Sequence, residues 1–177
     1  MTNPWRRSDE LGITVSWPGV KDQPDLPALG LSFQLDPRLN TVRYYGLGPD
    51  ESYVDRCTGA LLGWHSYPVS EGLTRYEFPQ ESGNRRGVQV MTITGEDGHG
   101  IEVSGDGLEI SVSPYLPEEV AAAYHYEELQ GSCRTVLDVA MFRKGVGGDD
   151  SWGAPVLPQY RYPSDKPYTF TFKIRAI

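Results

Sequence analysis

The clearest candidate for chemistry in this sequence is the segment 145–152, which reads Gly-Val-Gly-Gly-Asp-Asp-Ser-Trp. Its glycines allow a tightly folded backbone that can hold an indole outward. The flat apolar face of an indole can stack on the C–H face of a pyranose, while nearby carboxylates accept hydrogen bonds from sugar hydroxyls. The candidate sugar-binding residues are Gly148, Asp149, Asp150, Ser151 and Trp152.

A second interpretation of this loop is structural. Trp152 could plug one end of a β-sandwich, with Asp149 and Asp150 capping neighbouring backbone amides. The residues alone favour this second interpretation. A phosphate site is excluded, because the loop lacks the Gly-Lys-Ser/Thr ending of a phosphate-binding loop and its paired acids would repel phosphate.

Three other carboxylates, Glu51, Asp55 and Glu81, each have an arginine nearby in sequence, at Arg56 or Arg85. An arginine lowers the pKa of a neighbouring carboxyl, which suits a structural ion pair better than a proton donor. We therefore expect ion pairs at these positions and no general acid or base.

The remaining residue types give no support for metal binding or nucleophilic catalysis. The histidines, His65, His99 and His125, lie in unrelated segments, so they do not form a ligand pattern. The sequence also contains no Gly-x-Ser-x-Gly elbow and no paired Cys/His context. No cofactor is expected in this chain.

Length and charge restrict the class of protein and its partners. The 177 residues suit a single domain, and 24 acidic against 16 basic residues give a formal charge of −8. This charge disfavours binding to nucleic acid or to an anionic membrane, and no apolar run is long enough to span a bilayer. Two separated cysteines are expected to be reduced thiols, which indicates a cytoplasmic protein.

The pattern along the chain predicts an all-β protein. Glu96-Asp97-Gly98 and Gly105-Asp106-Gly107 predict hairpin turns, residues 117–124 predict one short helix, and residues 50–80 predict a long ordered loop. In the last strand, alternation predicts that the aromatic side is buried. The predicted strands are 13–17, 29–36, 41–45, 87–94, 100–104, 108–113, 135–142 and 168–175.

Three motifs in order carry a family resemblance: residues 45–56 (YGLGPDESYVDR), 78–85 (FPQESGNR) and 145–155 (GVGGDDSWGAP). Together they closely resemble the C-terminal β-sandwich, or small-chain domain, of large β-galactosidases of glycoside hydrolase family 2. The similarity covers residues 11–177 and leaves 1–10 as a flexible tail. Two departures are Ser82, where the family usually has Asn, and the bulky, charged residues 142–144 before the loop.

The resemblance implies an antiparallel β-sandwich of the galactose mutarotase-like supersandwich type, with this chain as its C-terminal portion. It implies that the catalytic glutamates lie on a separate (β/α)8 barrel, which this sequence lacks, and that the family's catalytic part commonly uses Mg and Na. It also places Trp152 where the family's indole contacts the sugar at the active-site entrance, with residues 148–151 shaping the loop. This reverses the preference for a structural tryptophan.

The preferred hypothesis is a non-catalytic part of a β-galactosidase that completes the galactoside site of a catalytic large chain, within an oligomer. The first alternative is a stand-alone carbohydrate-binding or mutarotase-like epimerase domain. That chemistry needs an acid and a base on one concave face, and no His/Glu pair can be assigned to it. The second alternative is a purely structural assembly module without sugar contact.

Overall fold

The computed structural model describes residues 10–131, 133–150 and 152–177. These form an antiparallel sheet with one α-helix, α1 (Pro117–Ala122). None of the helices in the described residues has the length and apolar character needed to cross a membrane. The strands are β1 (Glu10–Trp17), β2 (Ala28–Leu35), β3 (Thr41–Gly48), β4 (Leu61–Pro68), β5 (Arg85–Thr94), β6 (Gly100–Ser113), β7 (Thr135–Arg143) and β8 (Tyr168–Ala176).

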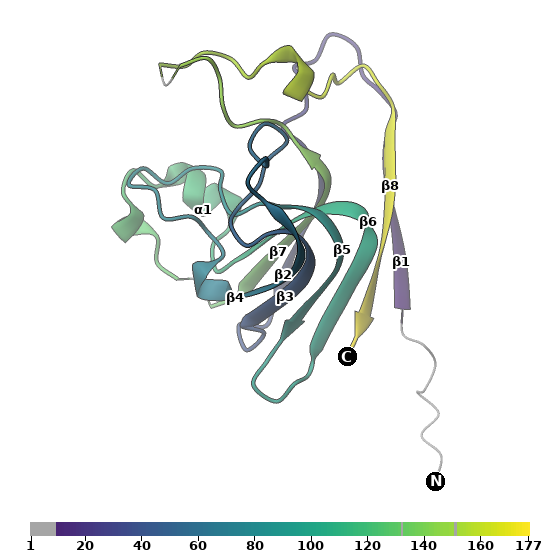
Figure 1. The fold of residues 1–177 in the computed structure, drawn as a ribbon, viewed down its shortest axis with the longest axis vertical. Coiled ribbons are helices and arrows are strands. Elements are labelled where there is room, and N and C mark those ends of the chain that lie inside the picture. Colours follow the sequence, from purple (N-terminus) through teal and green to yellow (C-terminus); the bar gives the residue numbers. More distant parts are fainter. Residues whose placement is uncertain (1–9, 132, 151) are drawn as a thin grey trace.

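The sheet divides into two branches at β6. Its hydrogen-bonded order is β1-β8-β6-β5-β3-β4, and a second branch adds β7 to β6 and β2 to β7. One edge of β6 pairs with β5, whereas the other edge pairs with β8 along residues 101–105 and with β7 along residues 109–113. Figure 1 shows β1 and β8 standing apart from β2 and β7. The expected all-β antiparallel fold with one short helix is confirmed.

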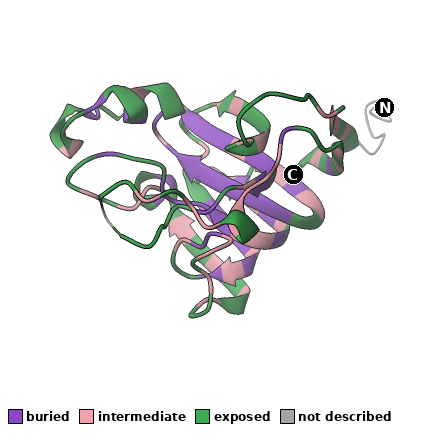
Figure 2. Cartoon of the chain, turned by 90° about the horizontal axis from the view of Figure 1, so that it is seen from above, coloured by how far each residue is buried: buried purple, intermediate pink, exposed green. Residues whose placement is uncertain are grey.

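The two branches enclose the core as the layers of a sandwich do. Phe33 of β2 and Phe172 of β8 meet edge to face with ring centroids 6.3 Å apart. In β8 the alternation is as expected, because Phe172 is buried while Thr171 and Lys173 are exposed. Figure 2 shows that the buried residues are concentrated in the central strands. The largest fully buried side chains include Tyr44, Tyr53, Met91, Ile93, Ile110 and Leu137.

The prediction of a hairpin turn at residues 105–107 was wrong. Both halves of β6 remain paired with β5, so the chain continues in one direction through this segment. Gly107 has a φ of 62°, which glycine adopts without the steric cost that a side chain carries. The pairing register with β5 shifts beside it, at Val88 and Leu108. The Asp-Gly pair therefore makes an irregularity that bends one long strand.

The prediction of a loop throughout residues 50–80 was also wrong, since β4 lies inside it. This strand pairs with β3 over its whole length and lies at the end of the sheet order. Its apolar residues fall on both faces, and Leu61, Leu62 and Trp64 are exposed. An edge strand of this kind lacks the alternation from which half-buried strands are recognised.

Helix α1 is shorter than predicted. It ends at Ala122 because Ala123 adopts extended backbone angles, with φ −81° and ψ 137°. Its start is fixed by Glu119, whose carboxylate accepts a 2.8 Å hydrogen bond from the amide of Leu116. Val120 is buried with Tyr115 in a small cluster separate from the main core.

Candidate functional site

Three segments that are far apart in sequence meet at the base of the Gly-rich loop: the β3–β4 connection, the segment before β5 and the end of β7. Glu81 joins all three. It accepts a 3.0 Å hydrogen bond from the Tyr53 hydroxyl, and the Arg143 guanidinium donates to both of its oxygens, at 3.1 and 3.2 Å. Two of the motifs that carried the family resemblance, 45–56 and 78–85, are thus joined to the end of β7, which leads into the third motif.

Arg143 fixes the point where the loop leaves the sheet. Its guanidinium also donates to Asp138, at 3.2 Å, and its backbone amide donates to Glu109, at 3.1 Å. Only 12% of its side chain is exposed. Burial alone would lower the pKa of Arg143, but the charges of Glu81 and Asp138 outweigh it and raise this pKa. The arginine therefore remains charged and holds two carboxylates.

Of the three expected ion pairs, the one at Glu51 was correct, the one at Glu81 forms with a different arginine, and Asp55 is described below. Glu51 pairs with Arg56, as expected. Glu81 pairs with Arg143 rather than with Arg85, whose guanidinium lies 4.9 Å from the ring centroid of Tyr67.

Glu51 is held by several donors besides Arg56. It accepts hydrogen bonds from the Gly83 amide, at 2.6 Å, and from the hydroxyls of Thr74 and Tyr76, both at 2.7 Å. Burial would raise the pKa of Glu51, but these donors and Arg56 outweigh it and lower the pKa. A carboxylate held in its charged form by so many donors is a structural acceptor, which agrees with the expectation from sequence.

Asp55 holds the Gly-rich loop itself, and it makes no ion pair among the described residues. Its Oδ2 accepts a 2.8 Å hydrogen bond from the amide of Gly147. Gly145 lies so close that an added Cβ would collide with the same oxygen and with Val156. Asp55 Oδ1 is buried and has no hydrogen-bond partner in the described structure. The expected ion pair at Asp55 was wrong, because its role as acceptor for a loop amide depends on a contact between distant segments.

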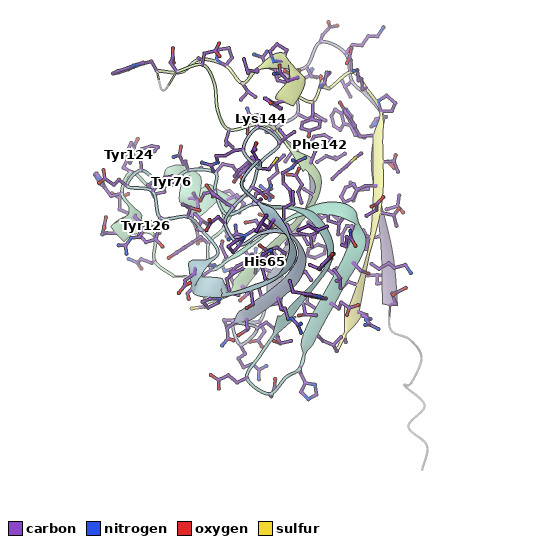
Figure 3. All side chains as sticks on the ribbon, in the orientation of Figure 1. His65, Tyr76, Tyr124, Tyr126, Phe142 and Lys144 are labelled. Carbon is purple, nitrogen blue, oxygen red and sulfur yellow. The ribbon has the colours of Figure 1, made fainter. Side chains whose placement is uncertain are left out.

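The two ends of the loop are joined by aromatic and backbone contacts. The ring of Phe142 stacks on Tyr162, with centroids 3.8 Å apart and planes 7° apart. The amide of Gly145 donates to the Tyr160 carbonyl, at 3.1 Å, and that of Lys144 to the Pro27 carbonyl, at 2.8 Å. Figure 3 shows Phe142 and Lys144 at the base of this loop. The bulk and charge of residues 142–144 therefore serve to anchor it.

At the tip of the loop, the backbone is organised and the indole is free. Asp150 Oδ1 accepts hydrogen bonds from the amides of Trp152, at 2.8 Å, and Ala154, at 3.2 Å. Gly148 packs against the Ala154 carbonyl too closely for a side chain. Trp152 is 93% exposed, so it does not plug the sandwich, whereas Asp150 does cap amides. Asp149 is exposed, and Ser151 lies outside the described residues.

The described residues offer no ligand set for the Mg or Na that the resemblance implied for a catalytic part. No three His, Cys, Asp or Glu side chains of residues 10–131, 133–150 and 152–177 form a group that could hold a metal ion. Of the histidines, His65 packs against Tyr44, with ring centroids 5.3 Å apart, and its Nε2 lies 3.0 Å from the Leu61 carbonyl oxygen.

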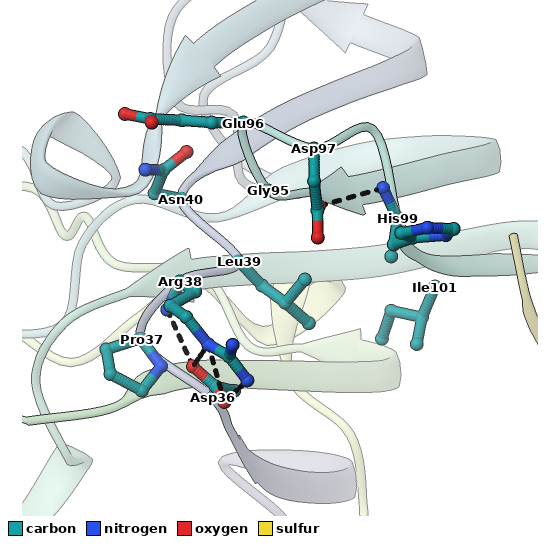
Figure 4. A pocket seen from close by; sticks show the side chains of 11 residues that line it. Asp36, Pro37, Arg38, Leu39, Asn40, Gly95, Glu96, Asp97, His99 and Ile101 are labelled. Atoms are coloured by element: carbon teal, nitrogen blue, oxygen red, sulfur yellow. Dashed lines mark hydrogen bonds and ion pairs between the residues drawn. The ribbon is translucent and has the colours of Figure 1, made fainter.

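A pocket of about 750 Å³ is separate from this loop. It lies between residues 36–40 and the β5–β6 hairpin, at the other end of the sheet (Figures 1 and 4). Its charged groups are largely satisfied locally: Arg38 pairs with Asp36 at 2.7 Å, and the His99 amide donates to Asp97 at 3.1 Å. The hydrogen bonds from Arg38 lower the pKa of Asp36 to about 2.

Comparison with known proteins identifies the family to which this chain is similar. The model of a family described as "Beta galactosidase small chain" matches residues 3–174. The chain is 42% identical to a β-galactosidase of Halalkalibacterium halodurans over 161 residues, which cover 90% of this chain and 16% of that protein. It is 36% identical to the β-galactosidase of Priestia megaterium over 169 residues, which cover 95% of this chain and 16% of that protein. It is 32% identical to the β-galactosidase of Vibrio vulnificus strain YJ016 over 154 residues, which cover 86% of this chain and 14% of that protein. The chain spans about a sixth of the length of the curated relatives it matches.

Proposed function

The chain belongs to the β-galactosidase small-chain family, and we propose that it is a non-catalytic part of a β-galactosidase whose Trp152 loop contacts the galactoside bound by a catalytic large chain. The observation that carries this proposal is the 93% exposure of Trp152 at the tip of a loop whose base is fixed. The proposed setting is a cytoplasmic oligomer, with the catalytic glutamates, and any Mg or Na, in the large chain.

An exposed indole on an organised loop suits contact with a sugar. Asp55 and Asp150 hold the loop backbone through the amides of Gly147, Trp152 and Ala154, so little conformational freedom remains to be lost on binding. Covering one face of the indole, on the order of 100 Å², stabilises a complex by about 2 kcal/mol. The loop therefore supplies affinity and orientation.

The surrounding acids support a non-catalytic role for this chain. Glu51, Asp55 and Glu81 all accept hydrogen bonds from groups that belong to the scaffold. A general acid needs a proton at neutral pH and access to the leaving group. The donors around Glu51 lower its pKa and so favour loss of that proton. The proposal accordingly assigns the acid and the nucleophile to the large chain.

The direct experiment is an assay of chromogenic galactoside hydrolysis by this chain alone, by the catalytic large chain alone, and by the two together. We expect no turnover by this chain alone and higher kcat/KM for the two chains together than for the large chain alone. Turnover by this chain alone, surviving purification away from other glycosidases, would refute the non-catalytic assignment.

A further inference from the structure

A second pocket, of about 350 Å³, lies on the face of β6 and β7 that points away from the main core. We call it the β6–β7 pocket, and its lining includes Phe78, Glu81, Ser111, Tyr115, Asp138 and Arg143. Ser111 and Asp138 are directly opposite each other in the β6–β7 ladder, so their side chains share one face of the sheet. Helix α1 and the segment before β5 form its other walls. Its volume is in the range of small-molecule sites.

The polar groups of this pocket are held in place before any ligand arrives. Arg143 donates to both Glu81 and Asp138, and the hydroxyl of Tyr53 also donates to Glu81. The side chains of Arg143 and Asp138 are only 12% and 18% exposed. Side chains fixed in this way lose little freedom when they bind a further group, which is what a binding site requires.

Part of this polar capacity is unused. Asp138 uses Oδ2 for Arg143, and its Oδ1 makes no hydrogen bond with another described residue. Glu81 is half exposed, so its carboxylate can also accept from a ligand. Phe78 on the rim is 58% exposed and contributes an apolar wall, in edge contact with Tyr124 at 6.3 Å. The pocket thus combines free acceptors, a serine hydroxyl and an aromatic surface.

We propose that the β6–β7 pocket is a second binding site, separate from the Trp152 loop, for a neutral polyhydroxylated molecule of monosaccharide size. Two carboxylates repel an anion from the pocket, while the guanidinium between them lowers the attraction for a cation. A hexose donates hydroxyl hydrogen bonds to Asp138 and Glu81, exchanges one with Ser111 and lays an apolar face on Phe78. This recognition requires no residue of the Trp152 loop.

The test is an NMR titration of the ¹⁵N-labelled chain with D-galactose and D-glucose, and with spermidine and inorganic phosphate as charged probes. We expect saturable shifts of the amides around Ser111 and Asp138 with a sugar and none with phosphate. Asp138→Asn and Ser111→Ala should each weaken binding, the former by about tenfold, because a hydrogen bond to a charged acceptor is weakened. Trp152→Ala should leave this binding unchanged.

The variants keep the test decisive if one of them is unstable. Ser111→Ala removes only a hydroxyl, and its dispersed amide spectrum would establish that the fold persists. Absence of saturable shifts with either sugar, a response to spermidine instead, or loss of binding in Trp152→Ala would each overturn the proposal. Because the assay uses no large chain, its failure is independent of the galactosidase assay above.

Discussion

The backbone amide of Gly147 donates a 2.8 Å hydrogen bond to the carboxylate of Asp55, across 92 positions of sequence. Asp55 belongs to the β3–β4 connection and Gly147 to the loop that carries Trp152. This hydrogen bond therefore holds the loop that carries the proposed sugar-contacting indole in place against the β3–β4 connection. In the proposed site Asp55 is a positioning residue, because its carboxylate holds the backbone of the loop.

Replacing Asp55 by alanine should loosen the loop. A hydrogen bond to a charged acceptor contributes about 1.5–3 kcal/mol, so we expect KM for a galactoside to rise about tenfold in the reconstituted enzyme, with a smaller change in kcat. Asp50→Ala is the matched control, since this exposed acid lies on the same connection. Equal kinetics for both variants would show that Asp55 does not position the loop.

Gly145→Ala should disturb the same hydrogen bond between Asp55 and the Gly147 amide, this time through a change in the loop. An added Cβ collides with Asp55 Oδ2 and Val156, so the variant should lose about 1–3 kcal/mol of stability and bind galactoside more weakly. Gly147→Ala is the control, because its added Cβ would lie 3.5 Å from Asp55 Oδ2, an ordinary contact. Urea denaturation and KM measure the two effects. If Gly147→Ala were the more disruptive variant, the packing argument for Gly145 would be contradicted.

Removing the guanidinium of Arg143 should be far more costly than removing an exposed one. Arg143→Ala leaves Glu81 and Asp138 without their shared cation, and breaking the largely buried pair with Asp138 costs about 3 kcal/mol. Arg38→Ala breaks an exposed pair with Asp36 and should cost less than about 1 kcal/mol. Urea denaturation of both variants compares them, and similar losses would refute the anchoring role of Arg143.

Acid should weaken the scaffold through Glu51. Despite burial, its hydrogen-bond donors and Arg56 place the folded pKa of Glu51 below the ordinary value of 4.5. Its stabilisation is therefore complete above about pH 4.5 and is lost as the pH falls through the lower folded pKa. Glu51→Gln should be destabilised at pH 7, and its difference from the parent chain should shrink in acid.

The measurement is the free energy of unfolding at a series of pH values from neutral to acid. Glu118→Gln, at an exposed position in the first turn of α1, is the control and should follow the parent chain throughout. A pH-independent difference between Glu51→Gln and the parent would contradict the assignment to the Glu51 charge.

Sequence patterns predicted the strands that are buried on one face. In β8, Phe170, Phe172 and Ile174 alternate with exposed residues, so the strand and its orientation both followed from the periodicity. Strand β4 did not follow, because an edge strand with exposed Leu61 and Trp64 has no clear alternation. The bend in β6 depends on pairing with β5, which no local turn signal reports.

The site was predictable in composition but not in geometry. The glycines, acids and tryptophan of residues 145–152 indicated an organised loop, yet the exposure of Trp152 depends on where that loop leaves the sheet. The direction is set by Asp55 and Arg143, and their partners lie far away in sequence or across strands. Local charge pairing suggested Arg85 for Glu81, whereas folding brought Arg143 to it.

The most direct test of the central claim is KM for a chromogenic galactoside in the large chain reconstituted with Trp152→Ala, beside Trp152→Phe as an aromatic control. Loss of the indole face removes about 2 kcal/mol of binding free energy, so we predict a KM at least about tenfold higher for the alanine variant. The phenylalanine variant should show a smaller rise in KM. Size-exclusion chromatography should show that both variants assemble as the parent chain does. An unchanged KM in a fully assembled Trp152→Ala enzyme would contradict the sugar-contacting role and leave assembly as the function of the chain.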